Sequence, residues 1–141
     1  GPFGGKSGEM VSFDFATKKI EKFTPANEDL GKVGNSREMT YVAHADWILF
    51  LDSVMAGEKS LTRLYDCAKN RYLVLDAGKT PQAEDKDLHS LSVNYDSRRQ
   101  LIYVIQAGGG IRALRLDPAT AQVQEKLPPP SGETPPAVKK P

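Results

Sequence analysis

The chain has little of what would place it in a specialised class of protein. Its 141 residues include one cysteine, Cys67, so no disulfide can form within the chain and no disulfide framework supports its fold. No apolar run approaches the ~20 residues that a membrane-spanning helix needs. The net charge is only +1, and lysines and arginines are scattered, so we expect neither nucleic acid nor a membrane as partner.

Neither end of the chain has the pattern of a folded element. A signal peptide is not evident, and Gly1-Pro2 is typical of the remnant of a cleaved tag, so residues 1–9 are expected to be that remnant and a glycine-rich lead-in. Residues 128–141 hold six prolines and almost nothing to bury, which predicts a disordered tail. We expect a soluble protein, and the sequence leaves its compartment open.

What is present is a series of short strands. Leu91–Lys126 predicts four consecutive antiparallel strands with three tight connections, because apolar runs such as Leu101–Ile105 alternate with turn clusters. The same pattern predicts earlier strands at Met10–Phe15, Ile20–Phe23, Glu38–Val42, Trp47–Leu51, Leu61–Tyr65 and Arg71–Leu75. Polar stretches predict loops at Thr24–Arg37, Ser53–Ser60 and Asp76–Asp87.

A repeat connects these strands. Asp14, Asp66 and Asp117 stand in the shared pattern apolar-Asp-x-Ala-polar, 52 and 51 residues apart, and an apolar residue follows each aspartate six positions later. Trp47–Leu51 also aligns with Gln100–Val104 at an offset of 53. Aspartates that recur in this way indicate a turn role rather than catalysis. A period near fifty with four short strands predicts the blades of a β-propeller, with a plain β-meander as the simpler alternative.

The last unit resembles a kelch repeat. Leu101–Ile105, Gly108–Gly110, Arg115–Thr120 and Leu127-Pro128 correspond to its strand, glycine pair, Asp-Pro turn and leucine-proline exit. The middle unit lacks the glycine pair, and no unit has the tryptophan of the last kelch strand. The turn at Tyr95–Val104 is similar to the first hairpin of NHL and gluconolactonase-type propellers, which is our second choice of family.

The resemblance implies an all-β fold, a partial β-propeller of about two and a half four-stranded antiparallel blades. The half blade would span residues 10–37, and the two blades residues 38–87 and 88–127. Propellers typically need four to eight blades, and an open one leaves strand edges free to pair. We therefore expect either a piece of a longer propeller, with the remaining blades as partners, or a homo-oligomer that completes the ring.

The resemblance also implies where ligands bind. In such propellers, the connections between blades and between the second and third strands gather on one face. On that mapping the candidate binding residues are Asp52, Ser53, Asp76, His89 and Gln106. His89 would enter an innermost strand near the central channel, whereas His44 would lie on the opposite face, among the hairpin turns.

The sequence predicts no catalytic residue, metal or cofactor. Its serines lack a Gly-x-Ser-x-Gly elbow, and Gly108–Gly110 lacks the lysine and helix of a phosphate loop. A lone histidine does not supply the three or four ligands of a metal site. The acidic residues Glu84, Asp85 and Asp87 do not have the spacing of a calcium loop.

The expected function is therefore a binding or interaction module that presents loops to a protein, peptide or glycan. Two alternatives stay open. One is a section of a propeller oxidase or lactonase, in which His89 would converge with an acidic residue such as Asp52 or Asp76 on a metal or cofactor. The other is a self-assembling partial propeller scaffold.

Overall fold

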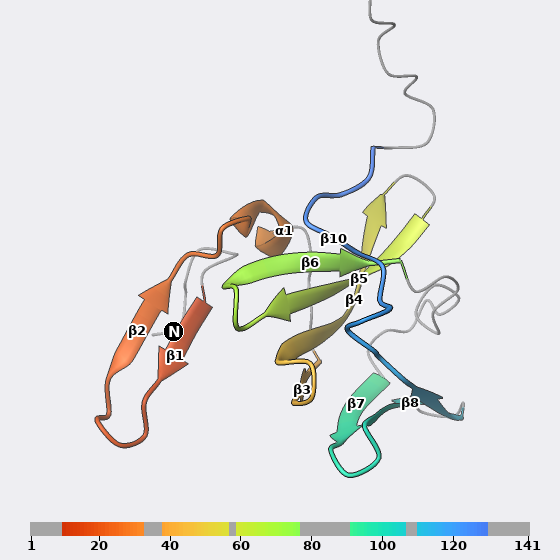
Figure 1. The fold of residues 1–141 in the computed structure, drawn as a ribbon, viewed down its shortest axis with the longest axis horizontal. Coiled ribbons are helices and arrows are strands. Elements are labelled where there is room, and N and C mark those ends of the chain that lie inside the picture. The colour runs from red at the N-terminus through yellow and green to blue at the C-terminus, as the bar shows by residue number, and fades with distance from the viewer. Residues whose placement is uncertain (1–9, 33–37, 57–58, 77–90, 107–109, 130–141) are drawn as a thin grey trace, which may run out of the picture.

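The computed structural model describes residues 10–32, 38–56, 59–76, 91–106 and 110–129. In this part of the chain the fold is all-β, with three antiparallel sheets and one short helix (Figure 1). The N-terminal hairpin consists of β1 (Met10–Phe13) and β2 (Ile20–Phe23). The short helix α1 (Glu28–Lys32) follows it.

The other strands form two larger sheets. The central sheet has the order β10-β6-β5-β4-β3 and the C-terminal sheet the order β7-β8-β9. The central sheet contains β3 (Met39–Val42), β4 (Trp47–Ala56), β5 (Lys59–Asp66), β6 (Arg71–Leu75) and β10 (Val123–Gln124). The C-terminal sheet contains β7 (Leu91–Asp96), β8 (Leu101–Gln106) and β9 (Ile111–Leu114).

Four hairpins turn through a corner of the same form. Each has a loop of four residues between its closing pair, and the last loop residue has a positive φ. These residues are Lys18 at 59°, Asp46 at 54°, Asn70 at 48° and Gln100 at 54°. A left-handed residue at this position returns the chain into an antiparallel strand, and asparagine and aspartate tolerate it better than most residues.

The predicted turn role of the repeated aspartates is confirmed. The Oδ1 atom of each accepts a backbone N–H two or three residues further on, as in an Asx turn. The donors are Ala16 at 2.8 Å for Asp14, Lys69 at 3.2 Å for Asp66 and Ala119 at 2.9 Å for Asp117. Asp96, which lies outside the predicted set, accepts from Arg98 and Arg99 in the same way.

The last strand of the C-terminal unit differs from the prediction. A strand does form at Val123–Gln124, but it pairs with β6 through Val123↔Leu75 and Gln124↔Val74 rather than with β9. The corner at Asp117 does not close a hairpin. Ala121 stands where the earlier corners have Lys18 and Asn70, and it does not adopt their positive φ, a conformation in which the alanine Cβ is strained.

Two predicted loops were wrong. Thr24–Arg37 contains α1, whose start is marked by Asn27 followed by two acidic residues. Ser53–Ser60 is largely strand, since Ser53–Ala56 belong to β4 and Lys59 and Ser60 to β5. The register with β5 shifts between Phe50 and Ser53, so this β-bulge interrupts the alternation by which the strand could have been recognised.

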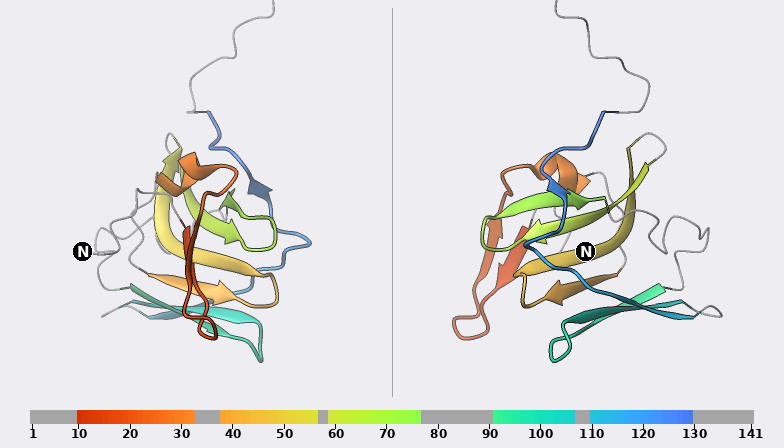
Figure 2. Two further views of the ribbon diagram at one scale, coloured as in Figure 1. Left: turned by 90° about the vertical axis from the view of Figure 1, so that its left-hand side faces the viewer. Right: turned by 45° about the vertical axis from the view of Figure 1, so that its right-hand side comes forward.

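The central sheet has an apolar core on each face: the C-terminal sheet covers one face (Figure 2), and α1 together with the Met10 and Phe23 end of the hairpin covers the other. One core forms against the C-terminal sheet from Val42, Trp47, Leu49, Leu51, Leu64, Leu73, Val93, Ile102, Val104 and Leu116. The other core contains Leu30, Phe50, Leu61, Tyr65, Tyr72 and Val74, with Met10 and Phe23 of the hairpin packed against it. The C-terminal sheet therefore packs face to face on the central sheet, whereas the hairpin touches the other core only through its Met10 and Phe23 end.

The predicted strand alignment between units was wrong by one residue. Asp46 and Gln100 occupy the same corner position, so Trp47 corresponds to Leu101 and the offset is 54 rather than 53. Side chains alternate between the faces of a strand, so a shift of one residue exchanges the two faces. With the corrected offset, Phe50 and Val104 both lie in the core toward the preceding sheet.

Candidate functional site

The predicted binding residues lie at one end of the sheets wherever the structure describes them. Asp52 lies within the register shift of β4, and Ser53 is the first paired residue after it. Asp76 is exposed and directly follows β6. Because Ser53 pairs with Thr62, and Thr62 with Leu75, Ser53 and Asp76 share the end of the central sheet opposite its hairpin corners.

Of the other two predicted residues, the structure describes only Gln106. Gln106 is the last residue of β8 and pairs with Leu91, the first residue of β7. It therefore lies at the end of the C-terminal sheet that is remote from the corner at residues 97–100. His89 lies outside the described residues.

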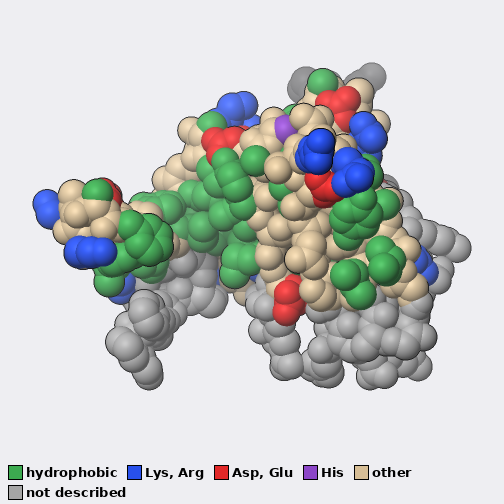
Figure 3. All heavy atoms as spheres, turned by 90° about the horizontal axis from the view of Figure 1, so that it is seen from below, with side chains coloured by type: hydrophobic (Ala, Val, Ile, Leu, Met, Phe, Trp, Pro, Cys, Tyr) green, Lys and Arg blue, Asp and Glu red, His purple; other side chains and the backbone are tan. Residues whose placement is uncertain are grey.

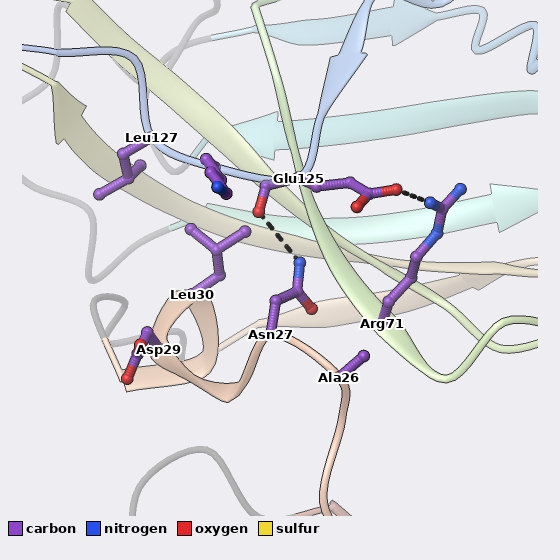
Figure 4. A pocket seen from close by; sticks show the side chains of 8 residues that line it. Ala26, Asn27, Asp29, Leu30, Arg71, Glu125 and Leu127 are labelled. Atoms are coloured by element: carbon purple, nitrogen blue, oxygen red, sulfur yellow. Dashed lines mark hydrogen bonds and ion pairs between the residues drawn. The ribbon is translucent and has the colours of Figure 1, made fainter.

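A hollow that the sequence did not predict lies beside the outer edge of the central sheet (Figure 4). Its volume is about 520 Å³. Its walls come from the approach to α1, from the start of β6 and from the chain after β10. The lining residues are Ala26, Asn27, Asp29, Leu30, Arg71, Glu125, Lys126 and Leu127.

Asn27 joins these walls, because its side-chain amide forms hydrogen bonds with backbone groups of two of them. Its Nδ2 donates to the carbonyl oxygen of Tyr72 at 2.5 Å, and its Oδ1 accepts the N–H of Tyr72 at 2.6 Å. The same Nδ2 donates to the carbonyl oxygen of Glu125 at 3.1 Å. The amide thus pairs with both polar backbone groups of one β6 residue, as a neighbouring strand would.

The rest of the β6 edge is covered as well. The N–H of Ala26 donates to the carbonyl oxygen of Asn70 at 3.1 Å, and β10 pairs with Val74 and Leu75. An uncovered edge strand would invite pairing with another chain. The segment before α1 and strand β10 therefore cover the outer edge of β6.

Charge in the hollow is balanced. Arg71 contacts Asp66, with Nε and Oδ2 3.3 Å apart, and also forms an ion pair with Glu125. Leu30 and Leu127 line the other end (Figure 4). The lining therefore combines an ion pair at one end with two leucine side chains at the other.

His44 lies in the hairpin corner between β3 and β4, as expected, and joins two sheets. Its Nδ1 lies 2.6 Å from the Tyr95 hydroxyl, and its Nε2 lies 2.7 Å from the carbonyl oxygen of Leu116. A carbonyl oxygen only accepts, so Nε2 carries a proton and donates it. The rings of His44 and Tyr95 also stack, with centroids 5.7 Å apart. His44 therefore has a structural role.

Cys67 is not an activated nucleophile. Burial, followed by the negative charges of Asp46 and Asp66, raises the pKa of its thiol. Little thiolate is therefore available at neutral pH, and the thiolate is the reactive form. Burial, together with the nearby Cys67, likewise raises the pKa of Tyr65 to about 12.

Sequence reasoning missed the hollow, although one signal was present. Asn27 followed by Glu28 and Asp29 is a helix-start pattern. Nothing local indicated that the Asn27 amide would pair with β6, because Tyr72 lies 45 residues further along the chain.

The described residues define an all-β protein of three antiparallel sheets. Comparisons of the chain with protein-family models, curated proteins and solved structures give no match. Among the described residues, no three histidine, cysteine or acidic side chains are grouped so that they could hold a metal ion. The helix in this part of the chain is too short to cross a membrane.

Proposed function

We propose that the chain is a binding module formed by part of a β-propeller, whose blades are the N-terminal hairpin, the central sheet and the C-terminal sheet. One observation carries the proposal: the central sheet has an apolar core on each face, one shared with the C-terminal sheet and the other with α1 and the Met10 and Phe23 end of the hairpin. Antiparallel sheets commonly have one buried and one solvated face. A sheet buried on both faces by its neighbours fits a stack of blades.

The shared corners support the same proposal. The aspartates of all three units accept a backbone N–H of the same corner, two residues further on for Asp14 and Asp117 and three for Asp66. Two of these corners, together with those before β4 and β8, end in a left-handed residue. Sheets that repeat one corner at a period near fifty are units of one architecture rather than parts of an irregular meander.

The ligand would bind at the end of the sheets opposite the hairpin corners. Asp52, Ser53, Asp76 and Gln106 lie at that end, and Asp52 is part of a β-bulge that ends at Ser53. Bulges are over-represented next to functional sites because they redirect side chains. We favour a protein or peptide ligand, because the backbone groups at the ends of strands can form hydrogen bonds with an extended peptide.

A binding screen tests this proposal. The purified chain is presented with a displayed peptide library and, in parallel, with a glycan array. We expect peptides to be enriched and their binding to weaken about tenfold in Asp76→Asn. The matched control is Arg98→Ala, because Arg98 is exposed at the hairpin-corner end and its loss should leave binding unchanged.

Three results would count against the proposal. If neither peptides nor glycans bind, the chain is not a binding module. If only glycans bind, the preference for a peptide is wrong. If ligands bind, and Arg98→Ala weakens their binding while Asp76→Asn does not, the binding face has been assigned to the wrong end of the sheets.

A further inference from the structure

We propose that the outward face of the N-terminal hairpin docks the C-terminal sheet of a second copy of this chain. The inference rests on the stacked-blade architecture of the proposed function and does not depend on its ligand. The outward face of the hairpin is formed by Val11, Phe13, Phe15 and Ile20, which are 45%, 45%, 79% and 58% exposed. Figure 3 shows hydrophobic side chains gathered on this projecting lobe.

This face of the hairpin is largely apolar. Register places Val11 and Phe13 of β1 opposite Lys22 and Ile20 of β2, on the same side of the hairpin. Phe15 packs edge to face on Phe13, with ring centroids 5.1 Å apart. The other side of the hairpin carries Met10 and Phe23, which pack on the central sheet.

The repeat shows what covers the equivalent face in the other units. The residue before the repeated aspartate is Phe13 in the hairpin, Tyr65 in the central sheet and Leu116 in the C-terminal unit. Tyr65 is 3% exposed, in the core toward the hairpin, and Leu116 is 7% exposed, in the core toward the central sheet. Both therefore face the preceding sheet, and Phe13 faces the place where a preceding sheet would lie.

A second repeat position agrees. Six residues after the aspartate, Tyr72 is buried in the core toward the hairpin, and Val123 packs on the core toward the central sheet. The equivalent residue in the hairpin is Ile20, which is exposed. The occupant that fits this face is therefore the outward face of another sheet of the same repeat.

The chain carries such a face at the other end of its own stack. Trp47, Leu49 and Leu51 are buried on the side of the central sheet that faces the C-terminal sheet. With the corrected offset, their equivalents are Leu101, Tyr103 and Ile105, on the side of β8 that faces away from the central sheet. Ile105 and its partner Ile111 are exposed.

Docking this face of one copy on the hairpin of the next repeats the contacts already present within the chain. Such an interface joins two different surfaces head to tail, so it can close into a ring or extend. The two surfaces can therefore be tested separately, because a variant that damages one surface keeps the other intact.

The test is sedimentation velocity of the full chain over a wide range of concentration. We expect the unmodified chain to associate as concentration rises. Phe13→Asp and Ile111→Asp, one on each surface, should each weaken self-association about tenfold or more, because each would bury an unpaired charge. Met39→Asp is the matched control, because Met39 is also an exposed apolar strand residue, at 58%, but lies on β3.

Mixing the two variants gives the decisive readout. Phe13→Asp keeps an intact C-terminal sheet and Ile111→Asp keeps an intact hairpin, so the mixture should form a one-to-one dimer that does not grow further. Circular dichroism of each variant confirms that it is folded. A symmetric interface would not be restored by mixing, and that outcome would overturn the proposal.

The proposal also fails if the unmodified chain stays monomeric at every concentration, or if Met39→Asp disrupts association as strongly as the other two variants do. Failure here is separable from failure of the proposed function. A monomer whose peptide binding still depends on Asp76 would leave the binding module intact and remove only the docking face.

Discussion

The side-chain amide of Asn27 pairs with both the N–H and the carbonyl oxygen of Tyr72. This contact joins the segment before α1 to the outer edge of β6. It also brings in the chain after β10, because the same amide donates to the carbonyl oxygen of Glu125. One side chain therefore connects three segments that are far apart in the sequence.

Asn27→Ala should lower the free energy of unfolding by about 2 to 3 kcal/mol, because it leaves partly buried backbone groups of Tyr72 without their partner. Urea denaturation measures the change. Asn94→Ala is the matched control: Asn94 is exposed and its amide makes one longer contact, 3.3 Å to Ser92. If both variants lose the same stability, the Asn27 amide does not hold the edge.

His44→Phe should cost about 1 to 2 kcal/mol of stability, because it keeps a ring beside Tyr95 but loses the hydrogen bond to the carbonyl oxygen of Leu116. Tyr95→Phe removes only the contact to Nδ1. Denaturation of both single variants and the double variant gives their coupling. Strictly additive losses would show that the histidine and tyrosine do not act together.

Stability should fall as the pH rises through about 10 to 12 because of Tyr65. Burial raises the pKa of its phenol from 10.0 to about 12, so the unfolded chain releases this proton at a lower pH than the folded protein does. The contribution is complete below about pH 10 and is lost toward pH 12. In this pH range the free energy of unfolding, measured by denaturation at each pH, should fall less steeply for Tyr65→Phe than for the unmodified protein. An equal slope in both proteins would contradict the shift.

Cys67 should react slowly with a thiol reagent at neutral pH, because burial raises the pKa of its thiol and only the thiolate attacks. The rate should increase toward that of a free cysteine when the protein is unfolded in urea. Measuring the reaction by absorbance with and without urea checks this. A folded protein that reacts as fast as the unfolded chain would show an accessible, unperturbed thiol.

The candidate site was predictable only in part. The loop-end residues came from a family resemblance, and the structure places Asp52, Ser53, Asp76 and Gln106 at the sheet ends opposite the hairpin corners. Their binding role stays a prediction. The hollow beside β6 could not be predicted, because its walls come from residues 26–30, 71 and 125–127, and no local pattern connects such distant segments.

The sequence by itself determined the strands and their corners. Alternating apolar residues and Asx-forming aspartates act over a few residues, so the Asp14, Asp66 and Asp117 turns and the strands could be predicted correctly, apart from the strand residues within Ser53–Ser60. Both depend on interactions between near neighbours in the chain.

Only the tertiary structure decided which strands share a sheet. The pairing of β10 with β6, the bulge in β4 and the one-residue correction between units depend on contacts between segments that are far apart in the sequence. Backbone hydrogen bonds are the same for any pair of strands, so the choice of partner is made by packing of the two cores on the central sheet.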